Sequence, residues 1–129
     1  MAYVELTKEN FEEVITVNDT VVVDYWADWC APCKSFGPIF EKVSEEFPGA
    51  VFAKVDTQYE QEIASWFQIR SIPTLMIFRE KVIVFTQAGA LPEGALREVV
   101  NKAENLDMEE VHKQVAEQQA KNGNQAPPA

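Results

Sequence analysis

The chain has 129 residues, 47% of them hydrophobic, and carries a formal net charge of −10. This length and composition fit one compact domain and exclude a fully disordered chain or a collagen-like fibre. The acidic balance disfavours binding to nucleic acid and to anionic membranes. No apolar run is long enough to cross a bilayer, and charged residues interrupt the N-terminus where a secretory core would lie. We therefore expect a cytoplasmic protein whose partners are proteins or small neutral molecules.

Strand-like apolar runs alternate along the chain with segments of helical periodicity, which is typical of an α/β fold. Run 21–27 is apolar on both faces apart from Asp24, which suits a central strand covered by helices on both sides. Runs 74–78 and 82–85 are only three residues apart, which predicts an antiparallel hairpin. In chain order, the sequence predicts a strand at 4–6, a helix at 10–17, a strand at 21–27, a helix at 32–47 with Pro38 inside it, a strand at 51–55, a helix from about 58 that ends before Ile72, strands at 74–78 and 82–85, and a helix that opens with Pro92 at its first position.

The end of the chain differs from the rest in composition. We expect a main domain over residues 1–105, an additional helical extension over 106–121 and a flexible tail over 122–129. In the extension, Asp107 precedes Glu110 at the spacing of a capped helix start. Met108, Val111 and Val115 then form a narrow apolar stripe. We expect this stripe to pack back on the domain, and binding to a partner is the alternative.

Cys30 and Cys33 are the only cysteines and enclose the motif Cys-Ala-Pro-Cys between a buried strand and a helix. This spacing lets the two thiols form a small-ring disulfide. Because the positive end of the helix dipole stabilises an anion, we expect Cys30 to be a thiolate nucleophile. Cys33 lies one turn further into the helix and is placed to attack a mixed disulfide on Cys30 and release the reduced partner.

Two other interpretations of the cysteine pair are weaker. A tetrahedral zinc site needs four ligands, and this chain offers two cysteines and the remote His112. An inert structural disulfide with so short a loop constrains little chain entropy, and a cytoplasmic setting keeps thiols reduced. The motif therefore indicates redox chemistry.

Asp24 is the only charged residue in its strand, where burial raises the pKa of a carboxyl and makes it a proton carrier near neutral pH. The alternative is an aspartate that reaches the surface at a strand edge. Lys54 lies in another predicted strand and either pairs with Asp24 across adjacent strands or faces water. The residues alone leave both pairs of alternatives open, with a slight preference for a solvent-facing Lys54.

Ile72 and Pro73 open a predicted strand. An ordinary trans bond is the commoner state before proline, whereas a cis bond turns the neighbouring backbone towards whatever docks there. Two tryptophans, Trp26 and Trp29, flank the cysteine motif, and such residues are most often core filler. Trp29, next to the nucleophile, is the better candidate for a substrate contact.

The chain from about residue 4 to residue 103 resembles thioredoxin. The block 23–34 is similar to that family's active-site segment, with Ala31 where glycine is usual. Pro38 matches the family's helix proline, 52–56 its central lysine strand, and 72–74 its cis-proline loop. Gly89 matches the glycine before the last helix.

The resemblance implies a thioredoxin fold, in which a central five-stranded mixed sheet is flanked by four helices, here with an extra C-terminal helix. It implies that Cys30 attacks, that Cys33 resolves, that Asp24 accepts the proton of Cys33, and that Lys54 is the neighbour of Asp24. The implied catalytic set is therefore Cys30, Cys33, Asp24 and Lys54. The implied substrate-binding set is Trp29, Ala31, Pro32, Ile72, Pro73 and Gly89.

The resemblance also implies a monomeric reductase of disulfide-containing client proteins, recharged by an NADPH-dependent thioredoxin reductase, with no bound cofactor or metal. A thioredoxin-fold adaptor or co-chaperone that holds clients, with redox chemistry secondary, is the alternative. An oxidase or isomerase is a further alternative within the enzyme class, because Ala31 alters the stabilisation of the thiolate. Two more departures from the family pattern, Ser71 and the glycine-free turn 79–81, do not touch the sulfur chemistry.

Overall fold

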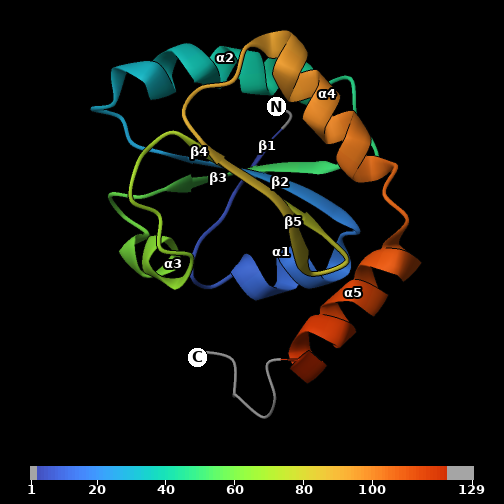
Figure 1. Cartoon of the computed structure of the whole chain (residues 1–129). Coiled ribbons are helices and arrows are strands. Elements are labelled where there is room, and N and C mark those ends of the chain that lie inside the picture. Colours follow the sequence, from blue (N-terminus) through green and yellow to red (C-terminus); the bar gives the residue numbers. More distant parts are fainter. Residues whose placement is uncertain (1–2, 122–129) are drawn as a thin grey trace.

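The computed structural model describes residues 3–121. Its centre is a five-stranded mixed sheet in the order β1-β3-β2-β4-β5, with helices on both faces (Figure 1). The thioredoxin fold expected from the resemblance is confirmed. The strands are β1 (Tyr3–Glu5), β2 (Thr20–Trp26), β3 (Val51–Asp56), β4 (Thr74–Arg79) and β5 (Val82–Ala88), and the helices are α1 (Phe11–Val17), α2 (Ala31–Ser44), α3 (Gln61–Trp66), α4 (Glu93–Glu104) and α5 (Met108–Lys121).

The sheet combines parallel and antiparallel pairs, as the loop lengths require. β1, β3 and β2 run parallel, whereas β4 pairs antiparallel with both β2 and β5. The predicted hairpin is therefore confirmed. Its two-residue loop, Glu80 and Lys81, adopts φ of 49° and 71° without a glycine, and positive φ at both central residues is the geometry that matches the twist of paired strands.

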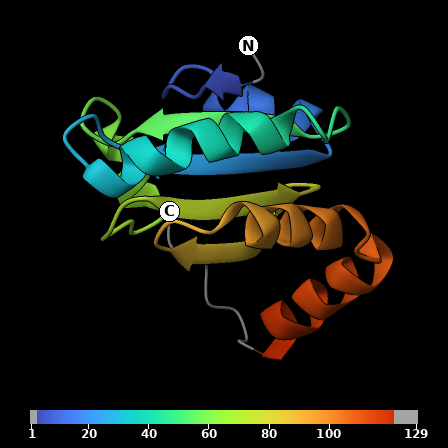
Figure 2. The same cartoon turned by 90° about the horizontal axis from the view of Figure 1, so that it is seen from above.

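Two apolar layers hold the helices on the sheet. Alternate residues of β2 point to opposite faces, so Val22 packs under α2 and α4, while Val21 and Val23 pack under α1 and α3. Both sides of the central strand are thus covered, as run 21–27 predicts (Figure 2). Asp24 shares the parity of Val22 and therefore lies on the face covered by α2. The sheet places this carboxyl beneath the helix that begins just after Cys30.

Several predicted boundaries are wrong by a few residues, each for a local reason. The helix expected from 58 begins only at Gln61, because the backbone N–H of Gln58 bonds the carboxylate of Asp56 in a turn. The helix expected to reach 47 ends at Ser44, after which the chain tightens into turns closed by short-range backbone bonds. Pro92 is the N-cap residue of α4, whereas the sequence predicted it at the first helical position.

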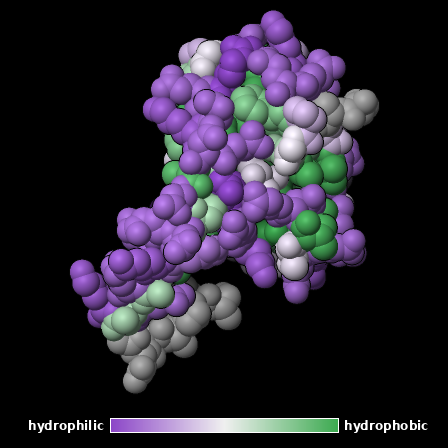
Figure 3. Space-filling model, turned by 90° about the vertical axis from the view of Figure 1, so that its right-hand side faces the viewer, coloured by the Kyte–Doolittle hydropathy of each residue, from purple (hydrophilic) through white to green (hydrophobic). Residues whose placement is uncertain are grey.

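The extension forms α5, which projects from the rest of the domain beside β5 (Figure 2). The predicted cap is present, since the N–H of Glu110 donates to Oδ1 of Asp107 at 3.2 Å. Met108 is buried, and Val111 and Val115 are half-buried, so the apolar stripe turns towards the domain. Between α5 and β5 an open groove of about 430 Å³ remains. The space-filling view shows that this side of the molecule is mostly hydrophilic, with separate hydrophobic patches (Figure 3). None of the helices among residues 3–121 is long and apolar enough to cross a membrane.

Candidate functional site

The two cysteines form a disulfide at the start of α2. Cys30 is the N-cap residue, and its Sγ accepts a hydrogen bond from the backbone N–H of Cys33 at 3.3 Å. The Cα atoms lie 5.2 Å apart, within the normal range for a disulfide. Both residues are buried in this oxidised state, together with Ala27. The pair predicted from the motif is therefore bonded, and a reversible two-electron couple needs this arrangement.

The helix start favours a negative charge on the first sulfur once the bond is reduced. The first turn of α2 contains no acidic residue, and a proline occupies its start. The backbone N–H of Cys33 already points at Sγ of Cys30, and the positive end of the helix dipole lies at the same place. These features stabilise a thiolate at Cys30 relative to its thiol.

The loop before β4 lies against the disulfide. Sγ of Cys30 is 3.7 Å from the carbonyl oxygen of Ile72, and the Ile72–Pro73 peptide bond is cis. The resemblance implied this state, whereas the residues alone favoured trans. Gly89, with φ of 96°, donates its N–H to the carbonyl of Pro73 at 2.8 Å. Residues distant in sequence therefore meet beside Cys30.

The predicted substrate-binding residues differ in exposure. Trp29 is 70% exposed beside the disulfide, so it is a surface residue and not core filler. Ala31, Pro32 and Gly89 are also exposed, Ile72 is half-buried and Pro73 is buried. An exposed indole and an exposed helix start next to a cis-proline loop give a partly apolar surface around the two sulfurs.

Asp24 is buried in the middle of the sheet. It is only 1% exposed, so the alternative of an aspartate at the surface is wrong. Its Oδ1 has no hydrogen-bond partner among residues 3–121. Burial raises the pKa of the Asp24 carboxyl to about 7, and the Lys54 ammonium partly opposes this rise. The group can therefore gain and lose a proton near neutral pH.

Lys54 takes neither of the two positions considered from the sequence. It lies opposite Asp24 in the register of β2 and β3, but its Nζ is 3.4 Å from Oε2 of Glu41. The same Nζ lies 4.4 Å from the ring centroid of Tyr3, and the side chain is only 12% exposed. Lys54 therefore neither bonds Asp24 nor faces water. Sequence reasoning missed Glu41, and no local pattern connects this helix residue with Lys54.

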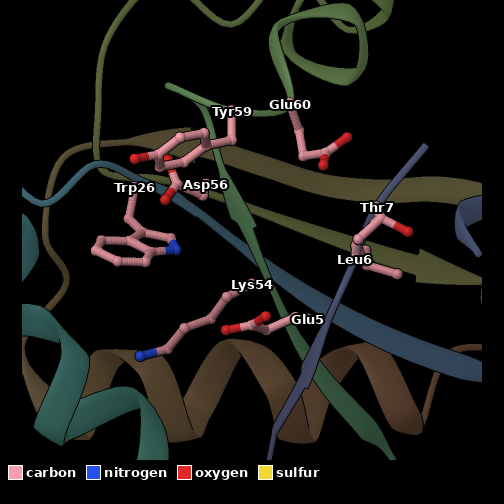
Figure 4. Close-up of a pocket in the computed structure, with 8 residues that line it drawn as sticks. All are labelled: Glu5, Leu6, Thr7, Trp26, Lys54, Asp56, Tyr59 and Glu60. Carbon is pink, nitrogen blue, oxygen red and sulfur yellow. The ribbon is translucent and has the colours of Figure 1, made fainter. Parts of the chain in front are cut away.

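A pocket of about 220 Å³ opens beside Lys54, between β1 and the turn before α3 (Figure 4). Trp26 forms part of its wall and also packs against the cluster that contains Cys30 and Cys33. Within residues 3–121, no group of three or more histidine, cysteine or acidic side chains is arranged to hold a metal ion. The lining residues are Glu5, Leu6, Thr7, Trp26, Lys54, Asp56, Tyr59 and Glu60.

Comparison with known proteins gives one consistent family. The thioredoxin family model matches residues 2–102. A putative thioredoxin 2 from Streptomyces coelicolor is 59% identical over 120 residues, which cover 93% of this chain and 90% of that protein. A thioredoxin from Mycoplasmoides gallisepticum is 39% identical over 93 residues, or 72% of this chain and 93% of that one.

Solved structures agree with the sequence matches. A mutant thioredoxin from Halobacterium salinarum superposes with a TM-score of 0.75 at 31% identity, covering 80% of this chain and 91% of that one. Spinach chloroplast thioredoxin F gives a TM-score of 0.75 at 31% identity, with 81% and 95% covered. The Streptomyces match covers so much of this chain that it extends into α5, whereas the family model ends before that helix.

Proposed function

The chain belongs to the thioredoxin family of disulfide oxidoreductases, and from that premise we propose that it reduces disulfide bonds in client proteins through Cys30 and Cys33. The observation that carries this proposal is the Cys30–Cys33 disulfide at the positive end of α2. In the reduced protein, the same two sulfurs supply the two electrons that a client disulfide needs.

Cys30 performs the first exchange. Its thiolate attacks one sulfur of the client disulfide, a new bond forms between Cys30 and the client, and the other client sulfur leaves as a thiolate. That thiolate takes a proton from water. The hydrogen bond from the N–H of Cys33 to Sγ of Cys30 supports this role, because it stabilises the attacking anion.

Cys33 performs the second exchange with the help of Asp24. The Cys33 thiol gives its proton to the Asp24 carboxylate, and its sulfur attacks Sγ of Cys30. The bond between Cys30 and the client breaks, the second client thiolate leaves and is protonated, and the Cys30–Cys33 disulfide remains. A carboxyl with a pKa of about 7 suits this role because it accepts and returns protons at the pH of the reaction.

The surface around the sulfurs is the proposed client site. Its members flank a cysteine in the sequence, lie in the loop that contacts Cys30, or, in the case of Gly89, donate a hydrogen bond to that loop. The apolar groups favour an extended client segment that lies against the cis-proline loop. The proposed residues are Trp29, Ala31, Pro32, Ile72, Pro73 and Gly89.

The oxidised protein must be reduced again before the next turnover. We assign this step to an NADPH-dependent thioredoxin reductase, so that NADPH acts through that enzyme and is not bound here. The proposal includes a cytoplasmic, monomeric protein in an electron-transport chain. Residues 1–105 are its redox domain and 106–121 its helical extension, and the expected tail 122–129 lies outside the described residues.

A trapping experiment tests the proposal. In a Cys33→Ser variant, the mixed disulfide on Cys30 has no resolving thiol, so we expect covalent client complexes that dithiothreitol releases. The control is the Cys30→Ser/Cys33→Ser variant, which must trap none. Clients that are held equally by this control, without a covalent bond, would instead indicate an adaptor.

A further inference from the structure

Asp24 and Lys54 have the geometry of a cross-strand ion pair that does not form. They are register partners in the parallel strands β2 and β3, so their side chains lie on the same face of the sheet. Yet Oδ1 of Asp24 has no partner among the described residues, and Nζ of Lys54 contacts other groups. Something in the fold must draw the ammonium away from the buried carboxyl.

The helix that covers this face supplies the competing anion. Oε2 of Glu41 on α2 is 3.4 Å from Nζ of Lys54. Gly37, one turn earlier on α2, lies beside the same ammonium, since a Cβ added there would be 3.7 Å from Nζ, an ordinary contact distance. The ring of Tyr3 lies 4.4 Å from the same atom and adds a cation–π contact. In Figure 4 the Lys54 side chain extends towards α2 and away from Asp56 and Tyr59. Its Nζ also lies 5.8 Å from the ring centroid of Trp26, a second and longer cation–π contact.

We propose that Glu41 is a positioning residue of the redox reaction, which holds the Lys54 ammonium on α2 and so prevents an ion pair between Lys54 and Asp24. This inference rests on the proposed function only in the role given to Asp24. A lysine bonded to Asp24 would stabilise the carboxylate, and a stabilised carboxylate is a weaker base for the Cys33 proton. Glu41 therefore keeps the base strong without touching either sulfur.

Other charged groups near Lys54 also affect where its ammonium lies. Glu5 on β1 is its register partner on the other side of β3, and Asp56 and Glu60 line the same pocket. α2 contributes Glu41 and the disulfide, and β2 contributes Asp24. Glu5 is exposed, so water screens its attraction for Lys54, whereas Asp24 is buried and has a free oxygen.

The direct test is the pKa of Asp24 in the oxidised protein, where Cys30 and Cys33 do not titrate. The signal to follow is the ¹³C shift of the Asp24 carboxyl carbon across a pH series. We expect Glu41→Gln to lower this pKa by about 1 or more, because the freed ammonium moves next to the carboxylate. The matched control is Glu45→Gln, which removes a charge from the end of the same helix at an exposed carboxylate with no ion pair among residues 3–121.

Removal of Glu41 also removes a negative charge that repels the Asp24 carboxylate directly. The Lys54→Met background separates the two causes, since only the direct effect survives there. We expect Glu41→Gln to change the pKa of Asp24 little in that background. In Glu41→Gln the freed Lys54 ammonium could pair with Glu5 and not with Asp24. The double variant Glu5→Gln/Glu41→Gln removes both competing carboxylates and tests this case. The inference is overturned if neither variant lowers the pKa of Asp24, or if the fall is as large without Lys54.

The kinetic consequence distinguishes this inference from the proposed function. In Glu41→Gln, the acid limb of the rate of Cys33 resolution against pH should move to lower pH by the same amount as the pKa of Asp24. If the pKa falls but the pH profile stays in place, Asp24 is not the base, and the proposed role of Asp24 fails while Glu41 still holds Lys54. If the pKa of Asp24 stays in place both in Glu41→Gln and in Glu5→Gln/Glu41→Gln, the Glu41 inference fails and the proposed function is untouched.

Discussion

The buried carboxyl of Asp24 should make the stability of the fold depend on pH in an unusual direction. Folding raises the pKa of this carboxyl from its ordinary value of 3.8 to about 7, chiefly through burial. At a pH between these two pKa values, Asp24 is protonated in the folded state and ionised in the unfolded state. Stability therefore falls as the pH rises from about 4 to about 7, and the loss is complete above the folded pKa.

The size of the effect follows from the same two values. Each pKa unit between the folded and unfolded states corresponds to about 1.4 kcal/mol. The raised pKa of Asp24 thus corresponds to a loss of about 4 kcal/mol of unfolding free energy at pH 8. Asp24→Asn removes the titration, because the amide stays neutral. Burial of the asparagine amide costs about 1–3 kcal/mol of unfolding free energy, and this cost is the same at every pH.

The assay is denaturant unfolding of the oxidised wild type and of Asp24→Asn at pH 4 and pH 8. We expect the variant to gain about 4 kcal/mol relative to the wild type between these two pH values, whatever its absolute stability. Other titrating groups cancel because both proteins contain them. An equal difference in unfolding free energy at both pH values would show that Asp24 does not titrate with a raised pKa, and would refute the reasoning.

Three further variants test other parts of the fold. Phe40 is fully buried, so Phe40→Ala should lower the unfolding free energy by about 3–5 kcal/mol, and a loss below 1 kcal/mol would contradict the core assignment. Gly89 has a φ of 96°, so Gly89→Val should lower the unfolding midpoint, and an unchanged midpoint would show that this backbone relaxes freely. His112 bonds the exposed Glu80 at 2.7 Å, so His112→Ala should cost less than about 1 kcal/mol globally while amide exchange in α5 becomes faster; unchanged exchange would show that this contact does not hold the helix.

Much of the fold was predictable because local patterns decide it. Run 21–27 contains a single charge, which favoured a strand covered on both faces, and the structure confirms such a strand. The residues alone did not decide between a buried and a surface Asp24, and only the structure shows that it is buried. The short link between β4 and β5 left no room for a crossover helix. The start of α3 was not predictable from periodicity, because the Asp56 side chain closes a turn that delays the helix.

The site was predictable in its chemistry but not in its contacts. The motif itself gave Cys30 and Cys33, since two thiols at the start of a helix have few other uses in such a chain. The contact between Lys54 and Glu41 depends on how α2 crosses the sheet, and an acidic residue on a helix surface gives no signal of it. The strand register indicated Asp24 as the partner of Lys54, and only the packed structure shows which carboxylate holds the ammonium.

The energetics of Asp24 support the chemical role proposed for this carboxyl, because the carboxyl does not stabilise the fold at neutral pH. The layer under α2 is otherwise a core of apolar side chains, in which a neutral residue of similar size would avoid the loss at neutral pH. A structural aspartate would have partners for both oxygens, and a lysine stands opposite it in the register, yet Oδ1 has no partner in the described structure. The fold thus directs the nearest cation to Glu41 and leaves the buried carboxyl with a pKa of about 7. A group that destabilises the folded state and titrates at the pH of thiol exchange fits the proton transfer proposed for Asp24, and packing gives no reason for it.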